Sequence, residues 1–252
     1  MKPRINQLTH ELIDQFIDRG HCEFVSEFAL PLPGIFICEQ LGLPAQEYET
    51  FKRWADAMLA MSQRPLTPEE AIVQAELEVE AQHHLAREFE KRRAEPSDDL
   101  ISLIVHAHQD EEPFTMEELQ DLMHQLVTGG FETTTAAISK SMLLLLKYPE
   151  QMEKLRADPS LTKTSLRKAS ASIVPLRVFE NNRLPAELSG TQIPEGAPVM
   201  PRFASANRDS EIFDEPDTFN IERDNVNQHV AFGLGNHFAW CVISKSRASR
   251  SI

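Results

Sequence analysis

The sequence predicts a mainly helical protein, an α-rich α+β fold with one long central helix and a small β region. Three observations support this fold class. Apolar residues recur at helical spacing over the first two-thirds of the 252 residues. One helix has a clear start signal at Thr115 and keeps its period to about Lys147. From about Arg183 the period is lost, and glycine- and proline-marked turns separate short apolar pieces.

Two apolar helices are predicted near the amino terminus. Apolar side chains at helical spacing over residues 5–17 predict the first helix, and Gly20 is expected to end it as a C-cap. Pro31 and Pro33 then interrupt the chain. The apolar stretch 34–43 is therefore predicted to form a second helix that begins after these prolines.

Three further helices follow before the central one. Residues 51–61 are predicted to be helical from their apolar spacing. Thr67 is a good N-cap for a long charged helix that runs to about Arg93, and Pro68 occupies its first position, where proline is tolerated. A proline-containing break separates this helix from a short one predicted over residues 99–108.

The central helix has the strongest start signal in the chain. Thr115 and Glu118 form a capping box, and large apolar residues follow at helical spacing. The pattern continues to about Lys147, which corresponds to roughly 50 Å of helix. A helix of this length spans a whole domain, so its midpoint is expected to lie deep inside.

The midpoint of this helix is unfavourable for helix formation. Residues 129–135 read Gly-Gly-Phe-Glu-Thr-Thr-Thr. Each glycine costs about 1 kcal/mol relative to alanine, and threonine side chains can bond back to the preceding turn. One interpretation is a kinked helix whose polar groups satisfy one another. The other is a site where bare backbone approaches a flat ligand beside an acid and a hydroxyl group.

The last third of the chain predicts a small β region and an ordered loop. Two turn signals surround short apolar pieces over residues 188–196, which is typical of a β-hairpin. Residues 207–224 are rich in proline, aspartate and phenylalanine and have no period. We expect this segment to be a loop held in place by Phe213 and Phe219.

Composition and targeting signals limit the classes of function. The formal net charge of -14 argues against nucleic acid and anionic membranes as partners, because both would repel the chain. No apolar run approaches bilayer length, and no secretory signal is recognisable. Cys22, Cys38 and Cys241 have neither a disulfide nor a zinc spacing. These features predict a cytoplasmic protein.

Two segments resemble the cytochrome P450 family in its soluble bacterial form. Residues 232–238, Phe-Gly-Leu-Gly-Asn-His-Phe, are similar to the family's loop Phe-Gly-x-Gly-x-His-x-Cys-x-Gly, whose cysteine thiolate binds haem iron. Residues 129–134 are similar to the family's oxygen-binding stretch, Ala/Gly-Gly-x-Asp/Glu-Thr-Thr/Ser. The resemblance implies a partial P450 fold, haem b as the cofactor and monooxygenation as the reaction. It also implies an apolar small-molecule substrate and a ferredoxin-type electron donor.

The resemblance implies roles for individual residues. Glu132 would belong to a proton-delivery route and Thr133 would hold dioxygen and its waters, because cleavage of the O–O bond requires protons. The implied cofactor-binding residues are Gly129, Gly130, Phe232, Gly233, Gly235, His237 and Arg177. Of these, the two helix glycines would lie against the porphyrin, and the histidine and the arginine would bind its propionates.

The sequence departs from the family pattern at the metal ligand and at a buried ion pair. Ala239 occupies the position of the thiolate, and the nearest cysteine, Cys241, lies two residues further on. The family's Glu-x-x-Arg should fall at 164–167, where the sequence reads Thr-Ser-Leu-Arg. A Glu-x-x-Arg at 180–183 is expected to be a coincidence, because no helical pattern surrounds it. We therefore expect this chain to be impaired or inactive, with Cys241 as the candidate iron ligand.

The departures are grouped in segments rather than scattered. The family's helices that precede residue 1 are expected to be missing. We hypothesise that the coding frame slips near 162–164, recovers near 186 and slips again at 239. The chain is thus predicted to be a single partial domain, 1–252. Its parts are a helical part (1–164) with the central helix (115–147), a divergent segment (165–185), the β region, loop and haem loop (186–238), and a divergent tail (239–252).

Two interpretations of another class stand beside this one. The chain could be a non-catalytic remnant or a helical interaction protein without haem, exposing apolar faces to partners. Alternatively, His229, His237 and Cys241 could hold a different metal, an idea that rests on their spacing alone.

Overall fold

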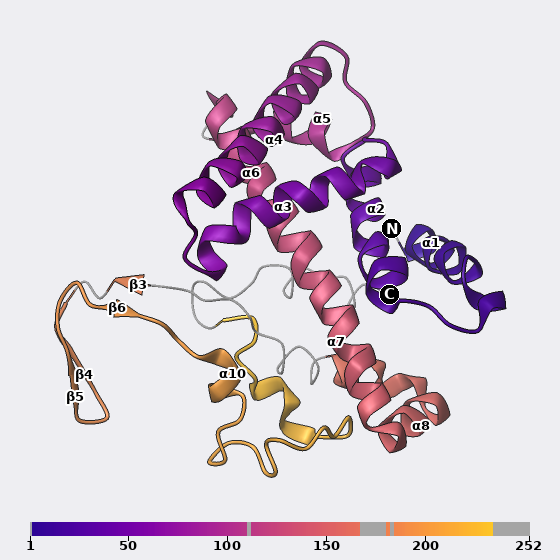
Figure 1. Ribbon diagram of the computed structural model, residues 1–252, viewed down its shortest axis with the longest axis vertical. Coiled ribbons are helices and arrows are strands. Elements are labelled where there is room, and N and C mark those ends of the chain that lie inside the picture. Colours follow the sequence, from indigo (N-terminus) through magenta and orange to yellow (C-terminus); the bar gives the residue numbers. More distant parts are fainter. Residues whose placement is uncertain (1, 110–111, 167–179, 182–183, 234–252) are drawn as a thin grey trace. The chain divides into compact units, whose positions relative to one another are not determined.

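The computed structural model describes residues 2–109, 112–166, 180–181 and 184–233 (Figure 1). The described residues are mainly helical, with three two-stranded antiparallel ladders. This confirms the predicted fold class. The chain divides into two compact units, Met1–Ser139 and Lys140–Ile252, with the division inside the central helix. Whether the chain is the single domain predicted above, with those internal boundaries, stays a prediction.

The first unit consists of helices and one short ladder. Its elements are α1 (Lys2–Asp14), η1 (Ile17–Arg19), η2 (Val25–Ala29), α2 (Pro31–Gln40), η3 (Ala45–Glu47), α3 (Tyr48–Gln63), α4 (Pro68–Ala94), α5 (Leu100–Val105), β1 (His108–Gln109), β2 (Glu112–Pro113), α6 (Met116–Val127), η4 (Thr128–Glu132) and the first part of α7 (Thr133–Lys147).

The second unit has shorter elements and more loop. Its elements are the rest of α7, α8 (Pro149–Ala157), η5 (Pro159–Leu161), β3 (Glu180–Asn181), β4 (Ala186–Leu188), β5 (Thr191–Ile193), β6 (Pro198–Val199), α10 (Phe203–Ala206) and η6 (Asp224–Gln228). No helix among the described residues is long and apolar enough to cross a membrane.

The amino-terminal helices confirm one predicted cap and correct one predicted end and one predicted start. Gly20 adopts φ 70° and its N–H bonds the carbonyl of Ile17, so it is the expected left-handed cap. It ends the short turn η1, however, because α1 already stops at Asp14. The prediction that α2 begins after the prolines is wrong. Pro31 is its first residue and Pro33 its third, because the first turn of a helix needs no backbone donor at these positions.

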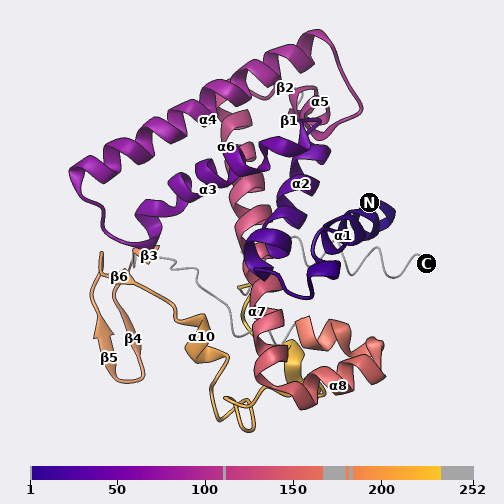
Figure 2. The same cartoon turned by 45° about the vertical axis from the view of Figure 1, so that its right-hand side comes forward.

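Helices α3 and α4 lie side by side as an antiparallel pair (Figure 2). The predicted start of α4 is confirmed. The Thr67 side chain accepts from the backbone N–H of Glu70, while the Glu70 carboxylate accepts from the backbone N–H of Thr67. This capping box satisfies two of the donors that a helix leaves free at its start, and Pro68 follows it at the first position.

The central helix runs through α6, η4 and α7 without leaving the helical region (Figures 1 and 2). Its capping box of Thr115 and Glu118 is confirmed. The five residues Thr128–Glu132 form a π-helical turn, which widens the helix at the Gly-Gly-Phe-Glu stretch. The weak helix sequence therefore does not break the helix; it changes the hydrogen-bond register there.

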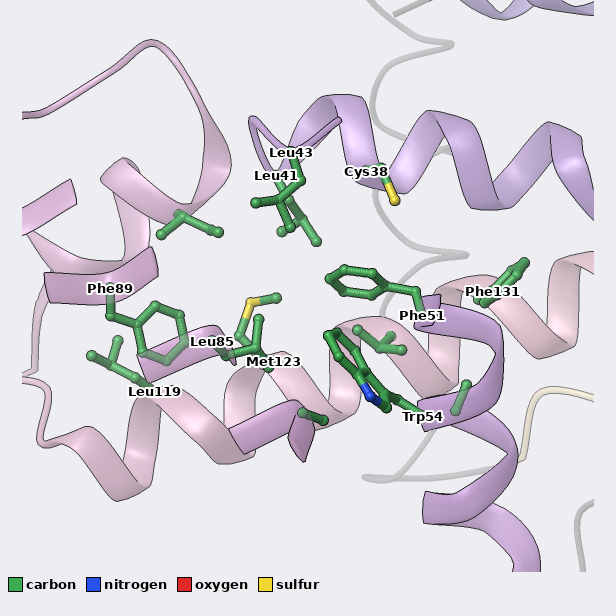
Figure 3. Packing of buried hydrophobic residues seen from close by; sticks show 14 of the residues in the cluster. Cys38, Leu41, Leu43, Phe51, Trp54, Leu85, Phe89, Leu119, Met123 and Phe131 are labelled. Carbon is green, nitrogen blue, oxygen red and sulfur yellow. The ribbon is translucent and has the colours of Figure 1, made fainter. Parts of the chain in front are cut away.

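The core of the first unit is formed by α2 to α6 (Figure 3). Phe51 and Trp54 of α3 have ring centroids 5.0 Å apart, and Phe89 of α4 packs in the same cluster. Met123 of α6 contributes a side chain with no exposed surface. Burial of such side chains stabilises the unit by about 2 kcal/mol each.

A buried ion pair closes one end of this core. The guanidinium of Arg92 donates to the Asp99 carboxylate at 2.6 Å and to the carbonyl of Gly42 at 2.8 Å. Gly42 has φ 71°, and a Cβ built on it would lie 2.1 Å from Asp99 Oδ2. Only glycine therefore fits between α2 and the start of α5.

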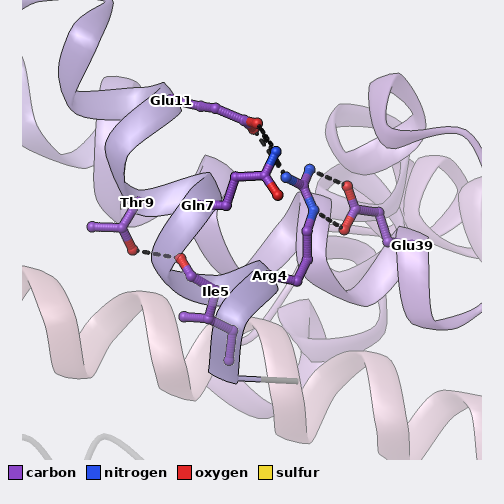
Figure 4. Close-up of polar contacts among 6 residues, drawn as sticks. All are labelled: Arg4, Ile5, Gln7, Thr9, Glu11 and Glu39. Carbon is purple, nitrogen blue, oxygen red and sulfur yellow. Dashed lines mark hydrogen bonds and ion pairs between the residues drawn. The ribbon is translucent and has the colours of Figure 1, made fainter.

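Helix α1 is tied to α2 by a second arginine (Figure 4). Arg4 donates through Nε and Nη2 to the two carboxylate oxygens of Glu39, and through Nη1 to Glu11 on its own helix. Gln7 also donates to Glu11 at 2.7 Å. The bidentate contact fixes the orientation of the helix as well as its distance, because the planar guanidinium matches the planar carboxylate.

The second unit contains the predicted hairpin and the predicted loop. Strands β4 and β5 pair with Ala186 opposite Ile193, and the two turn residues between them, Ser189 and Gly190, both have positive φ. This is the turn geometry that matches the twist of a two-residue hairpin. Phe213 and Phe219 are 4% and 3% exposed, so they hold the loop as expected.

Candidate functional site

One face of the central helix is open in the first unit. Leu122 and Leu126 of α6 are each 38% exposed, whereas Leu119, Met123 and Val127 on another face of the same helix are buried. Gly129 and Thr133 continue the same row at intervals of three and four residues, and both are exposed. The row therefore presents an apolar strip, then bare backbone, then a hydroxyl group.

The two predicted glycines have different surroundings. Apart from its chain neighbours and the backbone of its own helix, no atom of the described residues lies within 4 Å of a Cβ built on Gly129. A Cβ on Gly130 would lie 3.2 Å from Cδ1 of Ile37, a residue of α2. Gly130 thus allows α2 to pack closely against η4, whereas Gly129 leaves its backbone accessible to a ligand.

Thr133 bonds back to the π-helical turn. Its hydroxyl donates to the carbonyl oxygen of Gly129 at 2.6 Å. This bond fixes the position of the hydroxyl oxygen on the open face and uses its proton, while the oxygen lone pairs stay available to accept a hydrogen bond. A ligand in front of this face would meet an acceptor at a defined position.

Glu132 is held by a lysine from another helix. Lys52 of α3 places Nζ 3.3 Å from Glu132 Oε1, and the two side chains are 26% and 25% exposed. Lys52 also donates to Asp56, one turn further along α3. Glu132 Oε1 is shielded from solvent and makes no well-aligned hydrogen bond within the described part of the chain.

Electrostatics keep this lysine charged. Burial alone would lower the pKa of Lys52, but the hydrogen bond to Asp56 and the negative charges of Glu132 and Asp56 more than offset burial. The pKa of Lys52 therefore lies above its ordinary value, and the ammonium stays protonated at neutral pH. Glu132 therefore faces a lysine that carries a positive charge at neutral pH.

Sequence reasoning missed Lys52 and Asp56. The i, i+4 spacing of these two residues on a predicted helix is a readable signal for an ion pair. It does not indicate that Lys52 also reaches Glu132, which lies 80 positions later, since that contact depends on how α3 packs against η4.

The start of the glycine-rich loop lies in the second unit. The N–H of Gly233 bonds the carbonyl of Val230 at 3.0 Å, and Gly233 adopts φ 77°, which favours glycine. The Phe232 ring lies 5.4 Å from the His229 ring. His229 Nδ1 accepts from the backbone N–H of Ala231, so this histidine supports the turn.

The remaining predicted residues cannot be placed. Gly235, His237, Ala239, Cys241 and Arg177 lie outside the described residues, as does the arginine of the predicted 164–167 motif. Glu180, of the other Glu-x-x-Arg, lies in strand β3 rather than in a helix. The predicted metal site of His229, His237 and Cys241 is therefore not tested.

Comparison with known proteins decides the ancestry of these features. The family model described as Cytochrome P450 matches residues 55–160 and 163–240, which is most of the chain. The chain belongs to the cytochrome P450 family. The two matched ranges are separated by residues 161 and 162, which follow α8, and the second range ends one residue before Cys241.

Bacterial P450s are among the relatives. Cytochrome P450 CYP107DY1 of Priestia megaterium is 33% identical over 240 residues, covering 94% of this chain and 57% of that protein. Putative cytochrome P450 YjiB of Bacillus subtilis is 36% identical over 247 residues, covering 94% and 61%. The structure of P450BioI in complex with hexadec-9Z-enoic acid ligated acyl carrier protein superposes with a TM-score of 0.87 at 30% identity, covering 94% of this chain and 61% of that one. The chain thus spans about three-fifths of the length of these P450s.

Proposed function

We propose that the reaction of this chain is P450 monooxygenation, the insertion of one oxygen atom from O2 into an apolar small molecule, with haem b as cofactor. The observation that supports this most strongly is the open face of the central helix. The apolar strip of this face and the accessible backbone of Gly129 suit a flat apolar cofactor. The fixed hydroxyl of Thr133 adds a polar group beside the place where the cofactor would react. A ferredoxin-type electron donor and a cytoplasmic location belong to the same proposal.

The residues of this face would suit contact with a haem. Leu122 and Leu126 would contact the apolar ring, and Gly129 would let it approach the backbone. Phe232, Gly233, Gly235, His237 and Arg177 belong to the proposal as cofactor-binding residues, as the family resemblance implies. A bound haem iron with a thiolate ligand supplies oxygen activation and electron transfer.

The chain's own part in the reaction is to hold and move protons. Thr133 would hold a water molecule beside the oxygen substrate by accepting that water's hydrogen bond at its hydroxyl oxygen, which the Gly129 carbonyl holds in place. Glu132 would carry protons from solvent, and its ion pair with Lys52 would hold the carboxylate in position between transfers.

We further propose that the activity is impaired, because Ala239 has no atom that can bind iron. Cys241 is the replacement ligand if one exists. It lies two residues beyond the position that the loop presents, so it could reach the iron only with a rearranged loop.

The ferrous–carbonyl absorption spectrum tests the ligand. The full chain is expressed with haem supplied, and we expect at most a weak, strongly red-shifted Soret band. Ala239→Cys should strengthen this band, because it returns a thiolate to the predicted ligand position. Cys241→Ser should abolish any band of the parent chain, whereas the matched change Cys22→Ser in the first unit should leave it intact.

Two outcomes would contradict the proposal. If neither the parent chain nor Ala239→Cys takes up haem, the protein is the non-catalytic remnant or interaction protein considered above. A full thiolate band in the parent chain that survives Cys241→Ser would show that another residue binds the iron.

A further inference from the structure

The second unit contains a pocket of about 350 Å³ beside the carboxyl-terminal half of α7. Its walls come from that helix and from the loop that follows α10. The lining residues are Lys140, Leu144, Lys147, Tyr148, Arg208, Pro216, Asp217 and Phe219. None of these residues belongs to the proposed haem site, so the pocket needs an explanation of its own.

Among the described residues, two lysines of this pocket form no ion pair with a carboxylate. Lys140 and Lys147 lie two turns apart on the same face of α7, with Leu144 between them. Lys147 Nζ lies 5.5 Å from the centre of the Tyr148 ring, which is a neutral partner. Within the described part of the chain neither ammonium group meets a carboxylate. Both charges therefore face the pocket uncompensated.

The third cation is only weakly neutralised. Arg208 is positioned by a bond from Nη1 to the carbonyl of Ala204 at 3.0 Å, and its Nε lies 3.1 Å from Asp217 Oδ1. The Asp217 side chain is 87% exposed, and ion pairs in such surroundings contribute little. An incoming anion could compete with Asp217 for the guanidinium at small cost.

The apolar part of the pocket is rigid. The rings of Tyr148 and Phe219 pack with their centroids 5.7 Å apart, and Phe219 is 3% exposed. The loop behind them is fixed to α8, because the buried Gln151 side chain accepts from the backbone N–H of Ile221 at 3.0 Å. The pocket thus combines a packed aromatic wall with three cationic side chains.

We propose that this pocket binds a small organic anion, a carboxylate or phosphate ester carried on an apolar or aromatic body. Three cations against one exposed carboxylate give the pocket a net positive charge in a protein of net charge -14. Such a reversal of sign concentrates anions locally. The aromatic wall adds contact for the body of the ligand, which an inorganic ion would not use.

A matched pair of probes tests the chemistry. Benzoate and the uncharged benzamide have almost the same shape, so any difference between them reports on charge. We expect the full chain at low salt to bind benzoate saturably in an NMR titration, more tightly than inorganic phosphate, and to bind benzamide at least about tenfold more weakly. Added salt should weaken benzoate binding.

Variants locate the binding. Lys140→Gln and Lys147→Gln should each weaken benzoate binding about tenfold, whereas Lys163→Gln, an exposed lysine outside the pocket, should not. Asp217→Asn should tighten binding by freeing Arg208, while Asp214→Asn changes the net charge equally and should have no effect. Lys140→Arg should keep the affinity, which separates loss of charge from misfolding.

The proposal does not depend on haem. It is overturned if benzamide binds as well as benzoate, if the chain binds neither, or if Lys163→Gln weakens binding as much as Lys140→Gln. Failure of the haem test would not contradict this proposal, because no variant in this series changes the haem-facing residues of the central helix, Leu122 to Thr133.

Discussion

At the scale of single residues, the buried ion pair of Arg92 and Asp99 is expected to affect the stability of the first unit strongly. The side chains of Arg92 and Asp99 are 7% and 4% exposed, and they pair at 2.6 Å. Glu88 adds a second carboxylate at 3.1 Å, and Gly42 provides a carbonyl. Because each of the three guanidinium nitrogens of Arg92 donates to an acceptor, the pair is tolerated inside the unit.

Asp99→Asn is expected to destabilise the first unit by about 3 kcal/mol, because it leaves the Arg92 charge buried with a weaker partner. Urea unfolding followed by Trp54 fluorescence measures the change. Glu90→Gln breaks an exposed pair with Arg93 and should change stability by less than about 0.5 kcal/mol. Equal effects of the two variants would contradict the argument from burial.

Acid should remove the contribution of Asp99. Burial would raise its pKa, but the backbone N–H of Ser102 and the Arg92 guanidinium outweigh burial and hold the pKa below the ordinary value of 3.8. The unfolded chain then binds the proton first, so stability is present above 3.8 and is lost as the pH falls through the lowered pKa. The difference between wild type and Asp99→Asn should therefore disappear below that pH.

At the scale of elements, the π-helical turn in the central helix explains how an unfavourable sequence stays helical. A π-turn inserts one extra residue into the helix and redirects the side chains beyond it, and such turns are frequent at functional sites. Here it places Thr133 on the open face and Glu132 beside Lys52 of α3. The helix therefore continues through the glycines and threonines, which form part of its surface, instead of ending there.

Gly129→Ala is expected to stabilise the first unit by about 1 kcal/mol, because alanine is the better helix former and a Cβ there meets nothing in the described structure. The same change should weaken haem uptake by Ala239→Cys, since the methyl group would stand in front of the cofactor. Urea unfolding and haem titration measure the two effects.

Gly130→Ala is the matched control. Its methyl group would meet Ile37 at 3.2 Å, so we expect less stabilisation and no loss of haem uptake. If Gly129→Ala instead destabilises the unit, the face is covered in the folded chain and the proposed site is wrong.

At the scale of the whole molecule, the two units differ in how much apolar core they contain. All members of the main buried cluster lie between Cys38 and Phe131, in the first unit. Among the described residues of the second unit, the buried apolar side chains are Phe213, Phe219, Ile221 and Val226. Apolar burial is the dominant stabilising contribution, so the first unit should be the more stable one.

Hydrogen exchange should reveal this difference. Amides in α3, α4 and α6 are expected to exchange at least about a hundredfold more slowly than those in β4, β5 and α10, because opening the first unit exposes its core. Mass spectrometry of peptides from the two units measures the rates. Equal protection of α4 and the β4–β5 hairpin would show that the units unfold together.

The predictability of the fold follows from how local each signal is. The N-cap at Thr67, the capping box at Thr115, the cap at Gly20 and the β4–β5 hairpin were all predictable, because each depends on residues close together in the chain. The start of α2 was mistaken because proline is compatible with both a break and a first turn. Neighbouring sequence alone does not distinguish the two.

The candidate site shows the same limit. The motif of residues 129–134 predicted roles for Glu132 and Thr133. In the structure Glu132 is the last residue of the π-helical turn, and Thr133 follows it with an exposed side chain. Lys52 was not predictable, since its contact with Glu132 requires α3 to pack against η4. The anion pocket was equally hidden, because it combines α7 with a loop some 70 residues later.

The sequence by itself determined the helical class, the central helix, its family resemblance and the alanine at the thiolate position, because these are properties of local pattern and residue identity. Only the tertiary structure decided which side of that helix is open, why Gly130 differs from Gly129, and what holds Glu132. Those features depend on packing between segments far apart in the chain. Their geometry is set by close-packed side chains that no single segment contains.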